Sequence, residues 1–169
     1  MRILKHIAAI VVAIGLCQGC TIKYSFSGAS IPADAKTVSV DLFQNIAPQI
    51  NPMLSNQFTE ALKQRFTTQT RLSMVDALGD FAFSGQITNY SVTAVAIQGN
   101  ETAALNRLTI SVMVRFSNAI DPKADFERSF SQYDDYDSNQ NFSDVEDQLV
   151  QNILEKLIDE IFNASAANW

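Results

Sequence analysis

Apolar residues recur along the chain at two spacings, and each spacing predicts one kind of element. A spacing of three or four residues predicts two amphipathic helices, one over about 52–67 and one from Ser143 to about Phe162. Ser143 and Glu146 have the capping-box spacing that begins a helix. Strict alternation of apolar and polar residues predicts strands at about 37–43, 72–75, 81–94, 107–117 and 126–133.

The alternation in the longest predicted strand changes phase near Asn89. Phe81, Phe83 and Ile87 share one phase, whereas Tyr90 and the apolar positions after it take the other. One extra residue in the strand produces such a shift, so a bulge is expected here.

The predicted elements follow the order β-α-β-β-β-β-α. One sheet with one apolar face, and two helices to cover that face, predict an α+β fold. We expect a two-layer sandwich in which one mostly antiparallel, four- to five-stranded sheet packs against two helices. The length of 169 residues is that of one domain with a core of its own.

The first residues have the composition of a targeting signal. Arg2 and Lys5 precede the apolar run Ile7–Leu16, which is too short to span a bilayer, and Gly19 comes just before Cys20. We expect residues 1–19 to be a lipoprotein signal peptide, and Cys20 to carry the lipid anchor. Residues 20–36 would form the lipidated tether, and residues 37–169 a single α+β domain. An ordinary secretory signal and an uncleaved anchor are the alternatives.

The expected destination is the periplasmic side of the outer membrane. Thr21 follows Cys20, so the aspartate that would favour retention in the inner membrane is missing.

The charge of the mature chain excludes several classes of function. Without Arg2 and Lys5, 10 basic residues face 18 acidic ones, a net charge of −8, and His6 is lost with the signal. Nucleic-acid binding needs a concentrated basic patch, so no nucleic-acid partner is expected. The expected mature chain has no histidine and no cysteine besides the lipidated Cys20, so it lacks the residues for histidine-dependent catalysis and for zinc sites built from cysteine and histidine. We therefore expect no cofactor and no enzymatic site.

One polar stretch has the spacing of a calcium loop, with Glu146 at its twelfth position. Gln140 replaces the glycine of the sharp turn, a strand comes before the loop, and Glu146 also belongs to the capping box. We expect no metal, and keep calcium as a minor hypothesis whose ligands would be Asp135, Asp137, Asn139, Asn141 and Glu146.

The segment Ile97–Leu108 joins the two longest predicted strands. Gly99 and Asn100 form a good tight-turn pair, and about eight more residues precede the next apolar alternation. The hairpin would therefore end in a protruding tip, which is either an ordinary hairpin end or a functional loop.

Three stretches of the sequence resemble the LptE family of lipopolysaccharide-assembly lipoproteins, in the form found in Bacteroidetes. They are Cys20 with Tyr24–Gly28, then Asn51–Leu62, and above all Gly99–Ile110. The similarity covers essentially the whole mature chain, and the family fold is a single sheet backed by two helices.

The resemblance implies a non-enzymatic function. LptE lies inside the lumen of the outer-membrane barrel LptD, helps the barrel to fold, plugs it and assists lipopolysaccharide delivery to the outer leaflet. The residues implied at the contact with the partner or with lipopolysaccharide are Gly99, Asn100, Glu101, Thr102, Asn106 and Arg107. Enterobacterial members are thought to touch lipid A phosphates through basic residues near this tip. Here Arg107 is the only cation of the motif, so we expect direct binding of the anionic lipid A to be weak. The plug function does not depend on that binding, because a barrel lumen is polar and tolerates mixed charge.

A second function remains open from the residues alone. A periplasm-facing lipoprotein of similar fold could bind a small ligand or act as a scaffold in another envelope complex. A deep apolar pocket between the sheet and the helices would favour that alternative.

Overall fold

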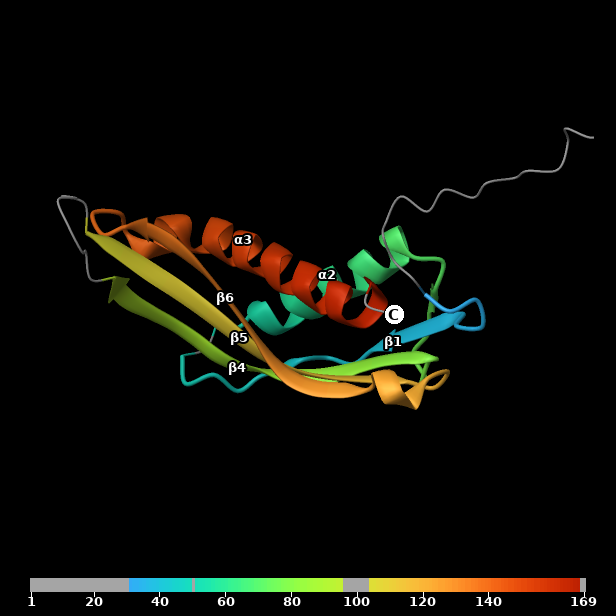
Figure 1. Cartoon of the computed structure of the whole chain (residues 1–169). Helices are drawn as coiled ribbons and strands as arrows, with labels where there is room; N and C mark the ends of the chain where they lie inside the picture. Colours follow the sequence, from blue (N-terminus) through green and yellow to red (C-terminus); the bar gives the residue numbers. More distant parts are fainter. Residues whose placement is uncertain (1–30, 50, 96–103, 168–169) are drawn as a thin grey trace, which may run out of the picture.

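The computed structural model describes residues 31–49, 51–95 and 104–167, and its elements follow the predicted order (Figure 1). The helices are α2 (Leu54–Gln69) and α3 (Phe142–Phe162), and a π-helical turn, η2 (Asn163–Ala167), continues α3. A 3₁₀ turn, η1 (Pro122–Ala124), lies between the last two strands. The strands are β1 (Thr37–Val40), β2 (Gln44–Asn45), β3 (Ser73–Met74), β4 (Phe81–Val95), β5 (Leu105–Asn118) and β6 (Phe126–Asp137).

The strands form one open, mixed sheet in the order β3-β1-β4-β5-β6, with β2 beside β4. The long strands β4, β5 and β6 pair antiparallel, whereas the short β1 and β2 pair parallel with β4, and β3 pairs parallel with β1. The two-layer α+β fold is confirmed. The two-residue β2 adds a strand that the sequence pattern did not predict.

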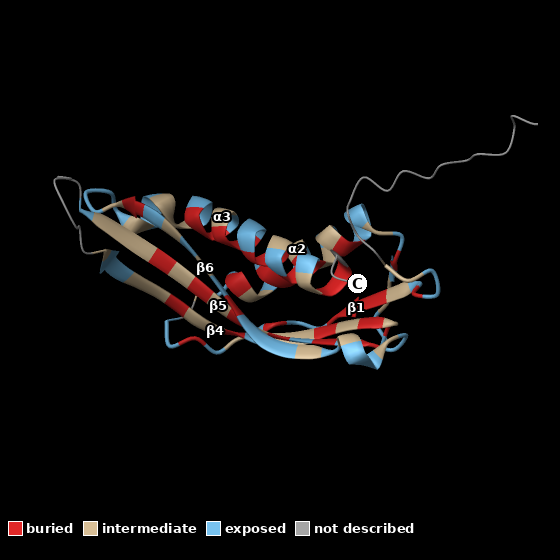
Figure 2. Ribbon diagram, viewed as in Figure 1, coloured by how far each residue is buried: buried red, intermediate tan, exposed pale blue. Residues whose placement is uncertain are grey.

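Both helices cover the same face of the sheet, and the core lies between the two layers (Figures 1 and 2). Alternate side chains of β5 point into this core, and so do the apolar stripes of the helices. Full burial of such a side chain contributes about 1.5–3 kcal/mol relative to leaving it exposed. The buried residues include Leu108, Ile110, Val112, Val114 and Phe116 of β5, Phe58, Leu62 and Phe66 of α2, and Ile153, Leu157 and Ile161 of α3.

The bulge expected near Asn89 is confirmed. The register between β4 and β5 shifts between Ile87 and Asn89. Ile87 and Tyr90 are three positions apart, so in a regular strand their side chains would point to opposite faces. Both are nevertheless buried, because the extra residue returns Tyr90 to the helix-facing side.

The capping box predicted at Ser143 is wrong. Helix α3 begins at Phe142, its N-cap is Asn141, and no side chain caps it. The Glu146 carboxylate instead accepts hydrogen bonds from Tyr90 and Asn51, as described below. Strand β6 also runs past residue 133 to Asp137, since polar residues continue its pairing with the start of β5.

Within the described part of the chain, neither helix is both long and apolar enough to cross a membrane.

Candidate functional site

The end of β4, the start of β5 and the end of β6 meet at one end of the molecule, which we call the distal end (Figure 1). Val95 at the end of β4 pairs with Leu105 at the start of β5, and Leu105 pairs with Asp137 at the end of β6. Helix α3 begins nearby, whereas the start of β1 and the end of α3 lie at the opposite, proximal end (Figure 1).

Four of the predicted contact residues, Gly99, Asn100, Glu101 and Thr102, lie outside the described residues. Asn106 and Arg107 lie on β5, where they pair with Ala94 and Thr93 of β4. Successive side chains of a strand point to opposite faces. Asn106 therefore shares the helix-covered face with buried Leu108, and Arg107 lies on the opposite, open face of the sheet.

Arg107 is held flat on the open face by two side chains of β6. Its Nε and Nη2 donate to the two carboxylate oxygens of Asp135 at 2.7 and 2.9 Å, and its guanidinium carbon lies 3.6 Å from the ring centroid of Tyr133. The bidentate bond lowers the pKa of the Asp135 carboxyl and raises the pKa of Arg107. Arg107 is thus a fixed cation rather than a mobile one.

The adjacent acids Asp134 and Asp135 bind different partners on opposite faces of the sheet. Asp135 pairs with Arg107 on the open face, whereas Asp134 accepts from Asn152 at 2.8 Å and from Lys156 at 3.2 Å on the helix-covered face. The alternation of β6 separates the two carboxylates, which leaves neither placed as an acid–base pair.

The residues of the minor calcium hypothesis are engaged separately. Asp135 binds Arg107, and Asp137 accepts both the backbone N–H and the side-chain amide of Asn139 at 2.9 Å. The side-chain amide of Asn141 donates to Asp144, and Glu146 lies on the helix side of the sheet. Within the ranges that the structure describes, no three acidic side chains form a group that could hold a metal ion.

A half-buried hydrogen-bond cluster near the distal end was not predicted. The Tyr90 hydroxyl donates to the Glu146 carboxylate at 2.5 Å, and the Asn51 amide donates to the same oxygen at 2.8 Å. Burial raises the pKa of Tyr90, and the bond to Glu146 raises it further. The three residues lie on β4, at the start of α3 and before α2, so no local sequence signal could have connected them.

The open face of the sheet is polar, and both arginines of β5 on this face are paired with acids of β6. Besides Arg107 and Asp135, Arg115 of β5 binds Glu127 of β6 at 2.6 Å. Between the two ion pairs, the Ser111 and Ser131 hydroxyls share a hydrogen bond of 2.8 Å. Both helices lie on the other face, so the part of the chain that the structure describes places no helix over this surface (Figure 1).

An open sheet, two helices on one face and a long projecting hairpin define a small two-layer α+β domain. The sequence model of the LptE family, described as lipopolysaccharide-assembly, matches residues 35–165. The chain belongs to this family. None of the curated protein sequences matches it significantly.

Solved structures share the fold at low sequence identity. A hypothetical protein from Chlamydia trachomatis matches with a TM-score of 0.55 and 10% identity, covering 79% of this chain and 99% of that one. A protein from Xanthomonas campestris matches with a TM-score of 0.52 and 9% identity, covering 80% and 85% of the two chains. The rare lipoprotein B from Shewanella oneidensis has a TM-score of 0.45 and 11% identity, covering 76% and 90%. At these identities the first two likenesses concern the fold alone.

Proposed function

We propose that the protein is a non-enzymatic outer-membrane lipoprotein that plugs an LptD-type barrel, aids its assembly and assists lipopolysaccharide transport. The match of the family's sequence model over residues 35–165 carries this proposal. Residues 1–19 would be removed as a signal peptide, Cys20 would carry the lipid, and residues 20–36 would connect it to the domain of residues 37–169.

The open face of the sheet supports the plug function. A barrel lumen is lined by polar side chains and accommodates mixed charge, whereas an apolar face would be poorly placed there. The open face presents hydroxyls such as Ser111 and Ser131, and its cations Arg107 and Arg115 are already paired. A polar wall could therefore contact these hydroxyls and both arginines without leaving either arginine as an unpaired buried charge.

A lipid anchor at Cys20 would favour a periplasmic attachment of the proximal end. Residues 20–31 can span at most on the order of 40 Å when fully extended, and the described chain starts beside β1 at the proximal end (Figure 1). A lipid on Cys20 would therefore tether the proximal end and leave the distal end to extend into the barrel.

Lipopolysaccharide contact is proposed for the tip only as a secondary function. Arg107 is the only cation of the Gly99–Thr109 segment, and Asp135 already neutralises it. An anionic glycolipid would need a cation that is free to bind it. Plugging and barrel assembly make no such demand.

Purification of the full-length lipoprotein from detergent-solubilised outer membranes tests the proposal. We expect a large β-barrel of the LptD type at one-to-one stoichiometry, and loss of correctly assembled barrel when the lipoprotein is depleted. A Cys20→Ala variant should accumulate unanchored and recover less barrel. Recovery of the protein solely with other envelope complexes would refute the proposal and favour the scaffold alternative.

A further inference from the structure

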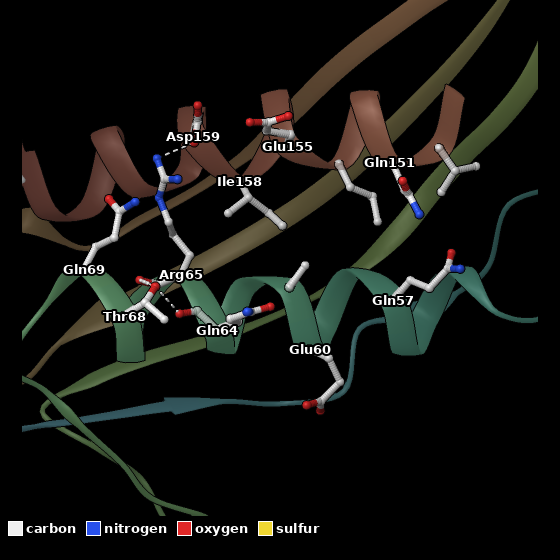
Figure 3. A pocket seen from close by; sticks show the side chains of 13 residues that line it. Gln57, Glu60, Gln64, Arg65, Thr68, Gln69, Gln151, Glu155, Ile158 and Asp159 are labelled. Atoms are coloured by element: carbon white, nitrogen blue, oxygen red, sulfur yellow. Dashed lines mark hydrogen bonds and ion pairs between the residues drawn. The ribbon is translucent and has the colours of Figure 1, made fainter. Parts of the chain in front are cut away.

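A solvent-open groove of about 480 Å³ lies between α2 and α3 (Figure 3). Its volume is within the roughly 300–1,000 Å³ typical of ligand-binding clefts. The floor is apolar: Leu154 and Ile158 of α3 are buried there, and Ala61 of α2 fills little space between them. The small side chain of Ala61 keeps the middle of the groove open.

One acid on the rim of the groove is left without an ion pair. Glu60, Glu155 and Asp159 all line the groove, but Lys63 binds Glu60 at 2.9 Å, and the Glu60 side chain points away from α3 (Figure 3). Arg65 is already bound in an ion pair with Asp159 (Figure 3) and lies 5.2 Å from the Phe162 ring centroid. No cation of the described residues forms an ion pair with Glu155, which is exposed at the rim. A negatively charged ligand would be repelled, whereas a cationic one would find an acceptor.

The uncharged part of the rims matches a polypeptide backbone. Gln57 and Gln64 of α2 and Gln151 of α3 stand along the two sides of the groove (Figure 3). Each primary amide offers both donors and an acceptor, which is what the N–H and C=O groups of an extended peptide require.

We propose that this groove binds an extended, positively charged peptide segment of a protein partner. Small apolar side chains of the segment rest on Ala61, Leu154 and Ile158, and a Lys or Arg side chain of the segment pairs with Glu155. The charge of Glu155 attracts the segment to the groove, and the apolar floor retains it. The proposal concerns the helical layer and does not require the partner to be the barrel.

Site-specific photocrosslinking in native cells tests the proposal. A photoreactive benzoylphenylalanine replaces Gln151 in the groove of the full-length lipoprotein, or Thr67 on the exposed side of α2 outside the groove. We expect the Gln151 adduct to map, by mass spectrometry, to one peptide stretch with a net positive charge. The Thr67 position should not give that adduct.

Charge reversal at Glu155 tests whether the charge on the rim determines the binding of the segment. Glu155→Lys should lower the yield of the Gln151 adduct about tenfold or more, because a lysine then faces the cationic segment. The matched control is Asp147→Lys, which reverses an exposed acid of the same helix outside the groove and should leave the yield unchanged. Both residues are exposed, so neither variant disturbs the core. Ala61→Phe, which fills the middle of the groove, should abolish the adduct, and circular dichroism will check that the variant is folded.

Several outcomes would overturn the proposal. They are an adduct on lipid, glycan or a second copy of the chain, an adduct on a neutral or acidic stretch, equal yields at Gln151 and Thr67, and equal losses with Glu155→Lys and Asp147→Lys. If the crosslinking result contradicts the groove proposal while the barrel still co-purifies, only the groove proposal is refuted. If Gln151 gives a specific adduct with a basic stretch but no barrel co-purifies, only the proposed plug function is refuted.

Discussion

At the scale of single residues, Tyr90 connects three segments that are far apart in sequence. Its hydroxyl and the Asn51 amide bind the same oxygen of Glu146, so β4, α3 and the segment before α2 meet at one carboxylate. The tyrosine is 2% exposed, and a buried donor paired with a carboxylate is stronger than an exposed bond. This cluster fixes the start of α3 at the distal end where a side-chain cap is missing.

Tyr90→Phe should lower the free energy of unfolding by about 1–2 kcal/mol at pH 7, since Glu146 loses a buried donor. The pKa of Tyr90 is raised above its ordinary value of about 10, so its contribution is fully present below pH 10 and is lost as the pH rises further. Urea unfolding at pH 7 and at pH 11 should show a smaller alkaline loss for the variant than for the wild type. Tyr136→Phe is the control, because Tyr136 is also buried but forms no hydroxyl hydrogen bond within the described residues.

Asp80 holds the start of β1 against the start of β4. One carboxylate oxygen accepts from the backbone N–H of Lys36 at 2.8 Å and from the N–H and hydroxyl of Thr37 at 2.9 Å. These bonds, led by that of Lys36, lower the pKa of Asp80. A lowered pKa stabilises the fold above the unfolded value of about 3.9, and the gain is lost as the pH falls through the folded pKa.

Asp80→Ala should therefore lower the melting temperature, with a constant deficit from pH 7 to pH 5 that narrows below about pH 4. Differential scanning calorimetry across this range measures the effect. Asp76→Ala removes an exposed acid nearby with no such bonds and should have little effect. A deficit that persists unchanged at pH 2–3 would mean that packing, and not the charged carboxylate, is responsible.

At the scale of the elements, the sequence pattern predicted both helices and the long strands because each has an apolar side that repeats over many residues. The bulge near Asn89 was predictable for the same reason: it shifts the phase of that repeat. The two-residue β2 has too few positions to form a pattern, and its pairing with β4 arises only in the folded chain. The capping box failed because Tyr90 and Asn51, distant in sequence, bind Glu146.

Gly85 lets β4 and β5 approach closely before the bulge. Its φ is +157°, and a Cβ added there would lie 2.0 Å from the Met113 carbonyl oxygen and 2.7 Å from Cε1 of Phe43. Gly85→Ala should therefore destabilise the fold by about 3 kcal/mol, because the backbone of β5 must move. Ser84→Ala, the neighbouring half-buried position, should change stability by no more than about 0.5 kcal/mol. Chemical denaturation of both variants gives the comparison, and similar stabilities would contradict the close approach.

At the scale of the whole molecule, the chain is acidic, yet each arginine of β5 on the open face is paired with an acid. Residues 20–169 have a net charge of −8, yet Arg107 and Arg115 on β5 each face an acid of β6 directly across the strand pair. The sequence could point to Arg107 through its motif, but the pairing with Asp135 needs the register of two strands. Arg115 lies eight residues away on the same face, but it binds a single oxygen of Glu127, whereas Arg107 binds both oxygens of Asp135 and also contacts the Tyr133 ring.

Substitution of the two arginines in turn distinguishes a functional arginine from a structural one. We expect Arg107→Glu to impair barrel assembly or lipopolysaccharide export, because like charges then repel at the distal end, whereas Arg115→Glu should not, although both break one cross-strand ion pair. Thermal unfolding should show a small loss for Arg115→Glu, whose ion pair is largely exposed, and a larger loss for Arg107→Glu, which also loses the contact with Tyr133. The double variant Arg107→Glu with Asp135→Arg restores the pair but moves the cation to β6. Recovery of stability without recovery of barrel assembly would assign Arg107 a contact with the partner. Full recovery of assembly and export, measured as correctly folded barrel and surface lipopolysaccharide, would assign it to the sheet alone.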